Sequence, residues 1–167
     1  MARDKPRLLL GLYARPKHPQ SYHYAILIAP KITEKDHGFN KARHLPVSKY
    51  HVKNTIQVID DQVAQPWRFE RVSIPNLSQD PRLLACIVIG KVVSLDVADK
   101  ILSQTPIYQV DDLDVERAGP FSCVTWVRDA VDRLHRSGGV TRMPNWEIIR
   151  TEALGYVHRK KEEGRWA

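Results

Sequence analysis

Three side chains of this sequence could together carry out acyl chemistry: the thiol of Cys123 and the imidazoles of His23 and His51. Cys123 stands at the start of a helix-like segment, where free backbone N–H groups and the helix dipole favour a thiolate. His23 and His51 each lie within a strand-like segment. An imidazole close to a thiol can accept its proton and activate it. The residues therefore predict a cysteine nucleophile that attacks an amide, ester or thioester.

Each of these residues also has an ordinary structural explanation. A cysteine on the apolar stripe of a helix is commonly an inert core residue. A histidine on a strand face is commonly a core residue with a hydrogen-bond partner. The segment around Cys123, taken alone, favours the structural explanation. The combination of two early strand histidines with one late helix-start cysteine is more specific, and it favours chemistry.

The helix that must position Cys123 has clear ends in the sequence. Ser122 is a good N-cap, and Gly138 and Gly139 follow the last apolar residue as stop signals. Cys123 belongs to the same apolar stripe as four later residues at helical spacing, namely Val127, Ala130, Val131 and Leu134. We therefore expect the thiol to face the protein interior.

The remaining elements follow from periodicity and turn residues. We expect strands over residues 8–14, 21–29, 48–55, 67–74 and 83–93, with 56–59 extending the third strand and 60–66 forming a turn. We expect helices over residues 94–103, 122–138 and 146–163. Strands come first and helices mostly last. This order favours an α+β fold, in which an antiparallel β-sheet packs with helices, over an α/β fold.

The chain of 167 residues is expected to form a single domain over 1–167, with an ordered core of about 6–160. Residues 31–47 are polar and basic, and we interpret them either as a lid or binding loop or as a plain insertion. Residues 111–119 are expected to form an acidic loop before the cysteine helix.

The composition limits the partners. The formal net charge is +7, yet the basic residues are spread out and do not alternate with aromatics, so nucleic acid is not an expected partner. The longest apolar run, residues 8–14, is too short to span a membrane. The two cysteines, Cys86 and Cys123, do not form a disulfide framework. We expect a soluble cytoplasmic protein with reduced thiols.

No metal or cofactor is expected. His37, His44 and His51 recur every seven residues, but no metal-ligand motif supports them. The glycines do not form a phosphate-binding loop, because Gly138 and Gly139 follow a helix where such a loop would precede one. The predicted partner is instead a small-molecule or peptide acyl substrate.

Three segments resemble a known family. They are Tyr22-His-Tyr-Ala-Ile-Leu-Ile28, Tyr50-His-Val52 and Ser122-Cys-Val-Thr-Trp-Val127. The pattern resembles the circularly permuted branch of the papain-like NlpC/P60 superfamily, which includes lecithin:retinol acyltransferase and the H-Ras-like suppressor phospholipase/acyltransferases. The whole chain is also similar to small uncharacterised fungal proteins with the same segments. The resemblance implies a permuted papain-like (NlpC/P60-type) fold.

The resemblance also implies roles for the candidate residues. Cys123 would be the nucleophile, His23 the general base and later acid, and His51 the residue that orients His23. Asn54 is an alternative for the orienting role. The backbone N–H of Cys123 would stabilise the oxyanion. Further candidates for oxyanion or substrate contacts are Tyr22, Tyr24, Asn54 and Ser122, although the tyrosines are better explained as packing residues.

The sequence departs from the family pattern around the nucleophile. Ser122 replaces an asparagine, and the three residues after Cys123 differ from the usual Glu-His-Phe. These differences argue against a phospholipid or retinyl substrate. They also keep two other functions open: a non-catalytic binding or scaffold protein on the same fold, and a basic module that binds an anionic partner.

Overall fold

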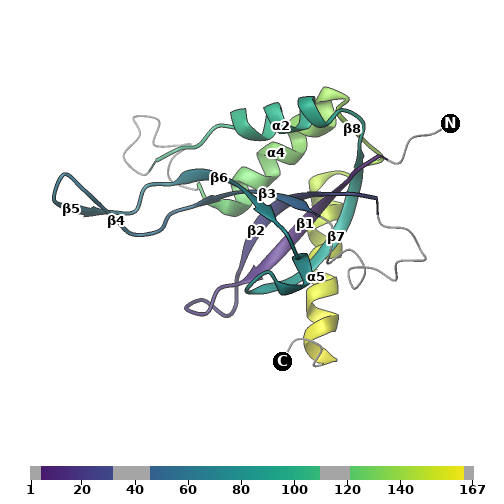
Figure 1. The fold of residues 1–167 in the computed structure, drawn as a ribbon. Coiled ribbons are helices and arrows are strands. Elements are labelled where there is room, and N and C mark those ends of the chain that lie inside the picture. Colours follow the sequence, from purple (N-terminus) through teal and green to yellow (C-terminus); the bar gives the residue numbers. More distant parts are fainter. Residues whose placement is uncertain (1–4, 32–45, 110–120, 164–167) are drawn as a thin grey trace.

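The computed structural model of the protein describes residues 5–31, 46–109 and 121–163. It is an α+β structure with one curled antiparallel sheet of six strands in the order β6-β3-β2-β1-β7-β8 (Figure 1). The strands are β1 (Arg7–Ala14), β2 (Tyr22–Ala29), β3 (Val47–Lys53), β6 (Arg68–Ile74), β7 (Leu83–Val92) and β8 (Val140–Thr141). The helices are α2 (Leu95–Gln104), α4 (Cys123–Ser137) and α5 (Trp146–Glu162). The predicted α+β class, an antiparallel sheet packed with helices, is thus confirmed.

Apolar residues on both faces place β1 and β2 in the middle of the sheet. On one face α4 packs against β2 and β3 while α5 packs against β1 and β7, and α2 packs on α4. The opposite face has a smaller cluster that includes Leu9, Leu27 and Cys86, closed by Leu77 from the short 3-10 helix η2 (Leu77–Gln79). Cys86 and Cys123 therefore belong to different clusters, on opposite faces of the sheet.

Helix α4 begins and ends where the sequence predicts. The Ser122 hydroxyl accepts a hydrogen bond from the backbone N–H of Thr125, and the Thr125 hydroxyl accepts one from the backbone N–H of Ser122. This reciprocal capping box satisfies N–H groups that a helix start leaves free. At the other end Gly138 adopts the left-handed conformation, with φ of 76°. The caps fix the first turn, which carries Cys123.

Removal of this cap should destabilise the protein. We expect Ser122→Ala to lower the free energy of unfolding by about 1 kcal/mol, because an N-cap side chain that accepts a backbone hydrogen bond is lost. Urea denaturation followed by circular dichroism measures the difference. Ser122→Thr, which keeps a hydroxyl at the cap, is the matched control and should lose less. Equal unfolding midpoints for the wild type and Ser122→Ala would contradict this account of the helix start.

Two sequence predictions about the region after β3 are wrong. Residues 56–59 do not extend β3, and residues 60–66 are not only a turn. Instead β4 (Gln57–Ile59) pairs with β5 (Gln62–Ala64) in a separate hairpin that projects from the body in Figure 1. Asp60 and Asp61 have φ of 50° and 64°. Two consecutive residues of positive φ give a tight hairpin turn, which aspartate tolerates better than most residues.

Other predictions differ in extent or lie outside the described residues. Strand β8 was not predicted, because a two-residue strand has no periodicity to detect. Most of the predicted loop 31–47 lies outside the described residues, and its last residue, Val47, begins β3. The predicted acidic loop 111–119 also lies outside them. Across the described ranges, no helix is long and apolar enough to cross a membrane.

Candidate functional site

A cavity of about 260 Å³ lies at the N-terminal end of α4. Four of its lining residues are sequence candidates: Cys123, His23, Asn54 and Ser122. The other lining residues are Arg15, Lys53, Thr55 and Trp67. The cavity is therefore built from the start of α4, the start of β2 and the segments that follow β1 and β3.

Cys123 and His23 reach this cavity from opposite faces of the sheet. Cys123 belongs to the helix-side core cluster together with Tyr24, and His23 precedes Tyr24 on β2, so its side chain points to the other face. The paired register of β2 and β3 runs from Ile26–Tyr50 to Ile28–Ser48, and β2 continues beyond it to Tyr22. The cavity lies at this far end of β2, where residues from both faces can line it.

The His23 ring is the first member of a chain of polar contacts. Its Nε2 lies 2.7 Å from Nδ1 of His51, and Nε2 of His51 lies 3.2 Å from Oε1 of Glu70. Glu70 also forms an ion pair with Lys53. His51 and Glu70 are direct partners in the β3–β6 register, which explains why the second contact forms. His51 does not line the cavity and lies behind His23.

These contacts determine where the protons lie on the two rings. The Glu70 carboxylate accepts a hydrogen bond, so Nε2 of His51 carries the proton and Nδ1 of His51 is an acceptor. Nε2 of His23 must then donate to it. Nδ1 of His23 is left without a proton. It is the ring nitrogen of His23 that can accept a proton.

The surroundings keep both histidines neutral. Burial lowers the pKa of His23 from 6.5 to about 3, and the neighbouring His51 and the cations Lys49, Arg15 and Lys53 contribute to this shift. Burial also lowers the pKa of His51, with a further contribution from Lys49, against the opposing effect of Glu70. Both rings are therefore hydrogen-bond partners and proton acceptors in the neutral form at pH 7.

The thiol differs from the sequence prediction in one respect. The position at a helix start was predicted to favour a thiolate, but Cys123 is only 7% exposed and its burial raises the pKa above the ordinary value. Hydrogen bonds from the backbone of Tyr24 and Val124 and the charge of Arg15 oppose this shift. Desolvation outweighs the helix start, so the cavity is lined at rest by a neutral thiol and a neutral imidazole.

The remaining candidates fall in different places. Ser122 caps α4 and lines the cavity, and Asn54 lines the cavity beside Lys53. Tyr22 and Tyr24 are not lining residues: the Tyr24 ring packs near Trp146 at a centroid distance of 6.3 Å, and Lys161 lies over the Tyr22 ring. No hydrogen bond joins the Cys123 thiol to either imidazole ring, both of which lie within the described residues.

Sequence reasoning missed Glu70 and Arg15. Glu70 meets His51 only because β6 pairs with β3 in one particular register, and nothing in the sequence of either strand sets that register. The alternation of residues 67–74 does put Glu70 on one face with Arg68, which is the only available signal. Arg15 directly follows the predicted strand 8–14, and nothing in the sequence indicates a role for it. Its place beside both His23 and Cys123 depends on the three-dimensional path of the segment after β1.

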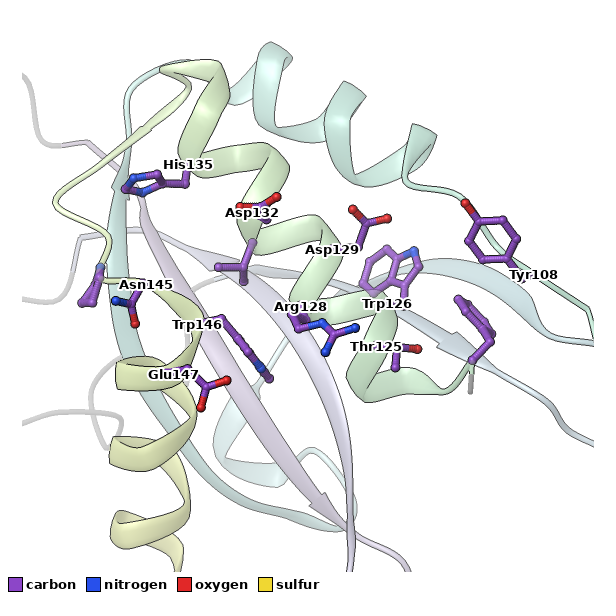
Figure 2. Close-up of a pocket in the computed structure, with 13 residues that line it drawn as sticks. Tyr108, Thr125, Trp126, Arg128, Asp129, Asp132, His135, Asn145, Trp146 and Glu147 are labelled. Carbon is purple, nitrogen blue, oxygen red and sulfur yellow. The ribbon is translucent and has the colours of Figure 1, made fainter. Parts of the chain in front are cut away.

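A larger cavity of about 700 Å³ lies elsewhere, between α4 and α5 (Figure 2). Its walls include the aromatic rings of Trp126, Trp146 and Tyr108. None of the candidate cysteine or histidine residues lines it. Size alone therefore does not locate the chemistry, and the smaller cavity is the candidate site. Among the residues with described coordinates, no group of three or more potential metal ligands occurs.

The low pKa of His23 should make stability depend on pH. Between about 3 and 6.5 the unfolded chain binds more protons at this residue than the folded protein, so the stability it contributes is complete above 6.5 and is lost as pH falls. We expect the free energy of unfolding to drop by about 1–2 kcal/mol more in the wild type than in His23→Gln between pH 7 and pH 5. Urea denaturation at both pH values measures the free energy of unfolding. Equal decreases in the wild type and in His23→Gln would contradict the lowered pKa of His23.

The fold and the site define a class: an α+β protein with a six-stranded antiparallel sheet, in which a helix-start thiol and a neutral imidazole line one cavity. Residues 5–167 match the model of a family of unknown function (DUF6914), and the chain belongs to this family. Comparison with the curated proteins gave no match, and comparison with the solved structures gave none either.

Proposed function

We propose that this protein is a cysteine-dependent hydrolase or acyltransferase that acts on an amide, ester or thioester of a small molecule or peptide. One observation carries the proposal: Cys123 and His23 line the same cavity, and the far side of the His23 ring is hydrogen-bonded to His51. A thiol, an imidazole base and an orienting group are the parts that nucleophilic catalysis by cysteine requires.

The first half of the reaction forms an acyl-enzyme. Sγ of Cys123 attacks the carbonyl carbon of the substrate while Nδ1 of His23 takes the thiol proton. The backbone N–H of Cys123, at the helix start, donates a hydrogen bond to the oxyanion. His23 then gives the proton to the leaving group as its bond to carbon breaks. The product is a thioester on Cys123 and a free alcohol, amine or thiol.

The second half releases the acyl group. Water or another nucleophile gives a proton to Nδ1 of His23 and attacks the thioester carbon, and the proton returns to Sγ as the C–S bond breaks. His51 keeps the proton of His23 on Nε2, which is the tautomer that both halves of the reaction need. Glu70 in turn keeps the proton of His51 on Nε2. Because the thiol and ring are neutral at rest, proton transfer accompanies attack rather than preceding it.

The permuted papain-like arrangement is part of the same proposal. The order along the chain is a histidine on β2, a second histidine on β3 and a cysteine at the start of α4. The antiparallel sheet and the helix-start position of the cysteine support this arrangement. In this reading His51 takes the orienting role, and Asn54 remains a cavity-lining residue without that role.

A non-catalytic binding protein on the same fold is the second candidate. The burial of Cys123 and its raised pKa favour it, since a buried thiol of raised pKa is unreactive unless a base assists it. The two candidates differ in whether a covalent intermediate forms. The experiment below decides between them.

The test is to trap the acyl-enzyme. The protein is mixed with 4-nitrophenyl acetate, quenched with acid and digested, and the acetylated peptides are identified by mass spectrometry. We expect an acetyl group on Cys123 that neutral hydroxylamine removes, as it removes a thioester. The Cys86→Ala variant should be acetylated on Cys123 to the same extent. Acetyl on lysines only, or on Cys123 to the same extent in His23→Gln, would refute the enzyme proposal and favour the binding protein.

A further inference from the structure

A second cavity, of about 660 Å³, adjoins the candidate site on the other side of His23. His23 and Arg15 line both cavities. The remaining residues that line this basic cavity include Tyr13, Lys17, His18, Lys49, Asp80 and Arg82. The two cavities therefore share the proposed base, His23, and one cation, Arg15.

Most of the charged side chains that line the basic cavity are cationic. It contains four cationic side chains and a single carboxylate, that of Asp80. This carboxylate is already occupied, because it accepts a hydrogen bond of 2.6 Å from the Tyr13 hydroxyl and lies 3.9 Å from Nζ of Lys49. Within the described residues, no carboxylate forms an ion pair with Arg15, Lys17 or Arg82. Their positive charges remain available to a ligand.

The backbone holds Arg82 in an unfavourable conformation at the rim of this cavity. Its φ of 67° lies in the left-handed region, which costs a non-glycine residue free energy. The Arg82 carbonyl accepts a hydrogen bond of 2.8 Å from the N–H of Ala14, which ties the turn to the end of β1. The turn between η2 and β7 therefore presents a cation next to Arg15 at a conformational cost.

We propose that the acyl compound attacked by Cys123 carries an anionic group, a carboxylate or a phosphate, that binds in the basic cavity while its carbonyl group lies beside Cys123. This inference rests on the proposed function for the acyl chemistry. The anion-binding site itself is inferred from the cavity and the charged side chains that line it. Arginine is suited to this task because its planar guanidinium group can donate two hydrogen bonds to one carboxylate or phosphate.

Binding of the anion also assists the chemistry. Burial is the largest cause of the low pKa of His23, and the charges of Lys49 and Arg15 lower it further, which makes the free imidazole a weak base. A bound anion offsets these two charges and so removes their part of the shift, which raises the pKa of His23. The base is thereby strengthened when a substrate of the correct charge is present.

The first experiment tests the anion site without any catalysis. Inorganic phosphate or glutarate is titrated into the protein at low ionic strength, and the ring signals of His18 and His23 are followed by NMR. We expect both signals to shift with saturation, and the binding to weaken by about tenfold in the double variant Arg15→Gln/Arg82→Gln. The matched control is Arg142→Gln, since Arg142 also has a positive φ, of 58°, but does not line this cavity.

Phosphate and glutarate distinguish the two sources of negative charge. Saturable shifts with phosphate alone indicate a phosphate-bearing substrate, and saturable shifts with glutarate indicate a carboxylate. Shifts that the double variant retains, or that Arg142→Gln weakens equally, would overturn the proposed site. The same holds if neither anion causes a shift.

The second experiment measures the preference for a charged substrate. Mono-4-nitrophenyl glutarate and 4-nitrophenyl valerate have acyl chains of equal length, but only the former ends in a carboxylate. We expect kcat/KM for the glutarate ester to exceed that for the valerate ester by about tenfold, and the ratio to fall towards one in Arg15→Gln/Arg82→Gln. Equal values in the wild type, with acyl-Cys123 formed from both esters, would overturn the inference but retain the acyl chemistry.

The two proposals can fail separately. If neither ester acylates Cys123 while phosphate or glutarate still binds through Arg15 and Arg82, the acyl chemistry is refuted and the anion-binding site is supported. If Cys123 is acylated without charge preference and neither anion binds, the anion site is refuted. The pair of experiments therefore assigns each outcome to one proposal.

Discussion

Replacement of Cys123 by serine should lower the rate of acyl-enzyme formation by about 10³-fold or more. A hydroxyl holds its proton far more tightly than a thiol, and the His23 imidazole, with a pKa of about 3, is too weak a base to compensate. The exchange of sulfur for oxygen changes the volume little, so the cavity and the cap of α4 should persist. The measurement is kcat/KM for 4-nitrophenyl acetate, with circular dichroism to verify the fold.

Cys86 provides the matched control for this variant. It lies in the cluster on the face of the sheet opposite the helices, and burial raises its pKa to about 12. We expect Cys86→Ala to change kcat/KM by less than about twofold, because this thiol does not line the cavity and is protonated throughout the working range. Comparable losses of kcat/KM in the two variants would mean that the loss comes from general destabilisation of the fold rather than from removal of the Cys123 thiol.

Much of the fold follows from local patterns. The ends of α4 could be predicted because Ser122 and Gly138 are cap residues at both limits of an apolar stripe. The central position of β2 could be predicted because both of its faces are apolar. The β4–β5 hairpin could not, since an Asp60-Asp61 turn lacks the glycine that usually marks such a hairpin.

The candidate site was only partly accessible to sequence reasoning. Cys123, His23 and His51 stand out by residue type within regular elements, and a family resemblance supplied their roles. Glu70 does not stand out in the sequence, because its contact with His51 depends on strand register, a long-range property. The raised pKa of Cys123 could not be foreseen either. The helix-start argument is local, whereas the burial that outweighs it comes from the whole core.

The second large effect should come from His23. We expect His23→Gln to lower kcat/KM for 4-nitrophenyl acetate at pH 7 by about 10²–10⁴-fold, the usual contribution of a general base. The glutamine is similar in size and can still donate a hydrogen bond to His51, so the loss reports the missing base. The exposed His158, which is paired with Glu162 on α5, provides the control His158→Gln, for which no loss is expected.

The pH profile distinguishes a lost base from a damaged structure. In the wild type the reactive pair is a neutral thiol and a neutral imidazole, so the rate should be level from about pH 5 to pH 8. In His23→Gln only the thiolate can react, and the rate should rise about tenfold per pH unit below the raised pKa of Cys123. A reduced but level profile in the variant would contradict a general-base role for His23.

The same assay ranks the residues behind His23. His51→Gln removes the imidazole that accepts from Nε2 of His23 and offers only an amide oxygen in its place, and we expect a loss smaller than that of His23→Gln, with the level profile retained. Glu70→Gln should have the smallest effect, about tenfold, because its amide can still accept from Nε2 of His51 but lacks the charge. A larger loss in Glu70→Gln than in His51→Gln would contradict the order of this chain of contacts. Such a result would instead assign Glu70 to holding Lys53 at the cavity wall.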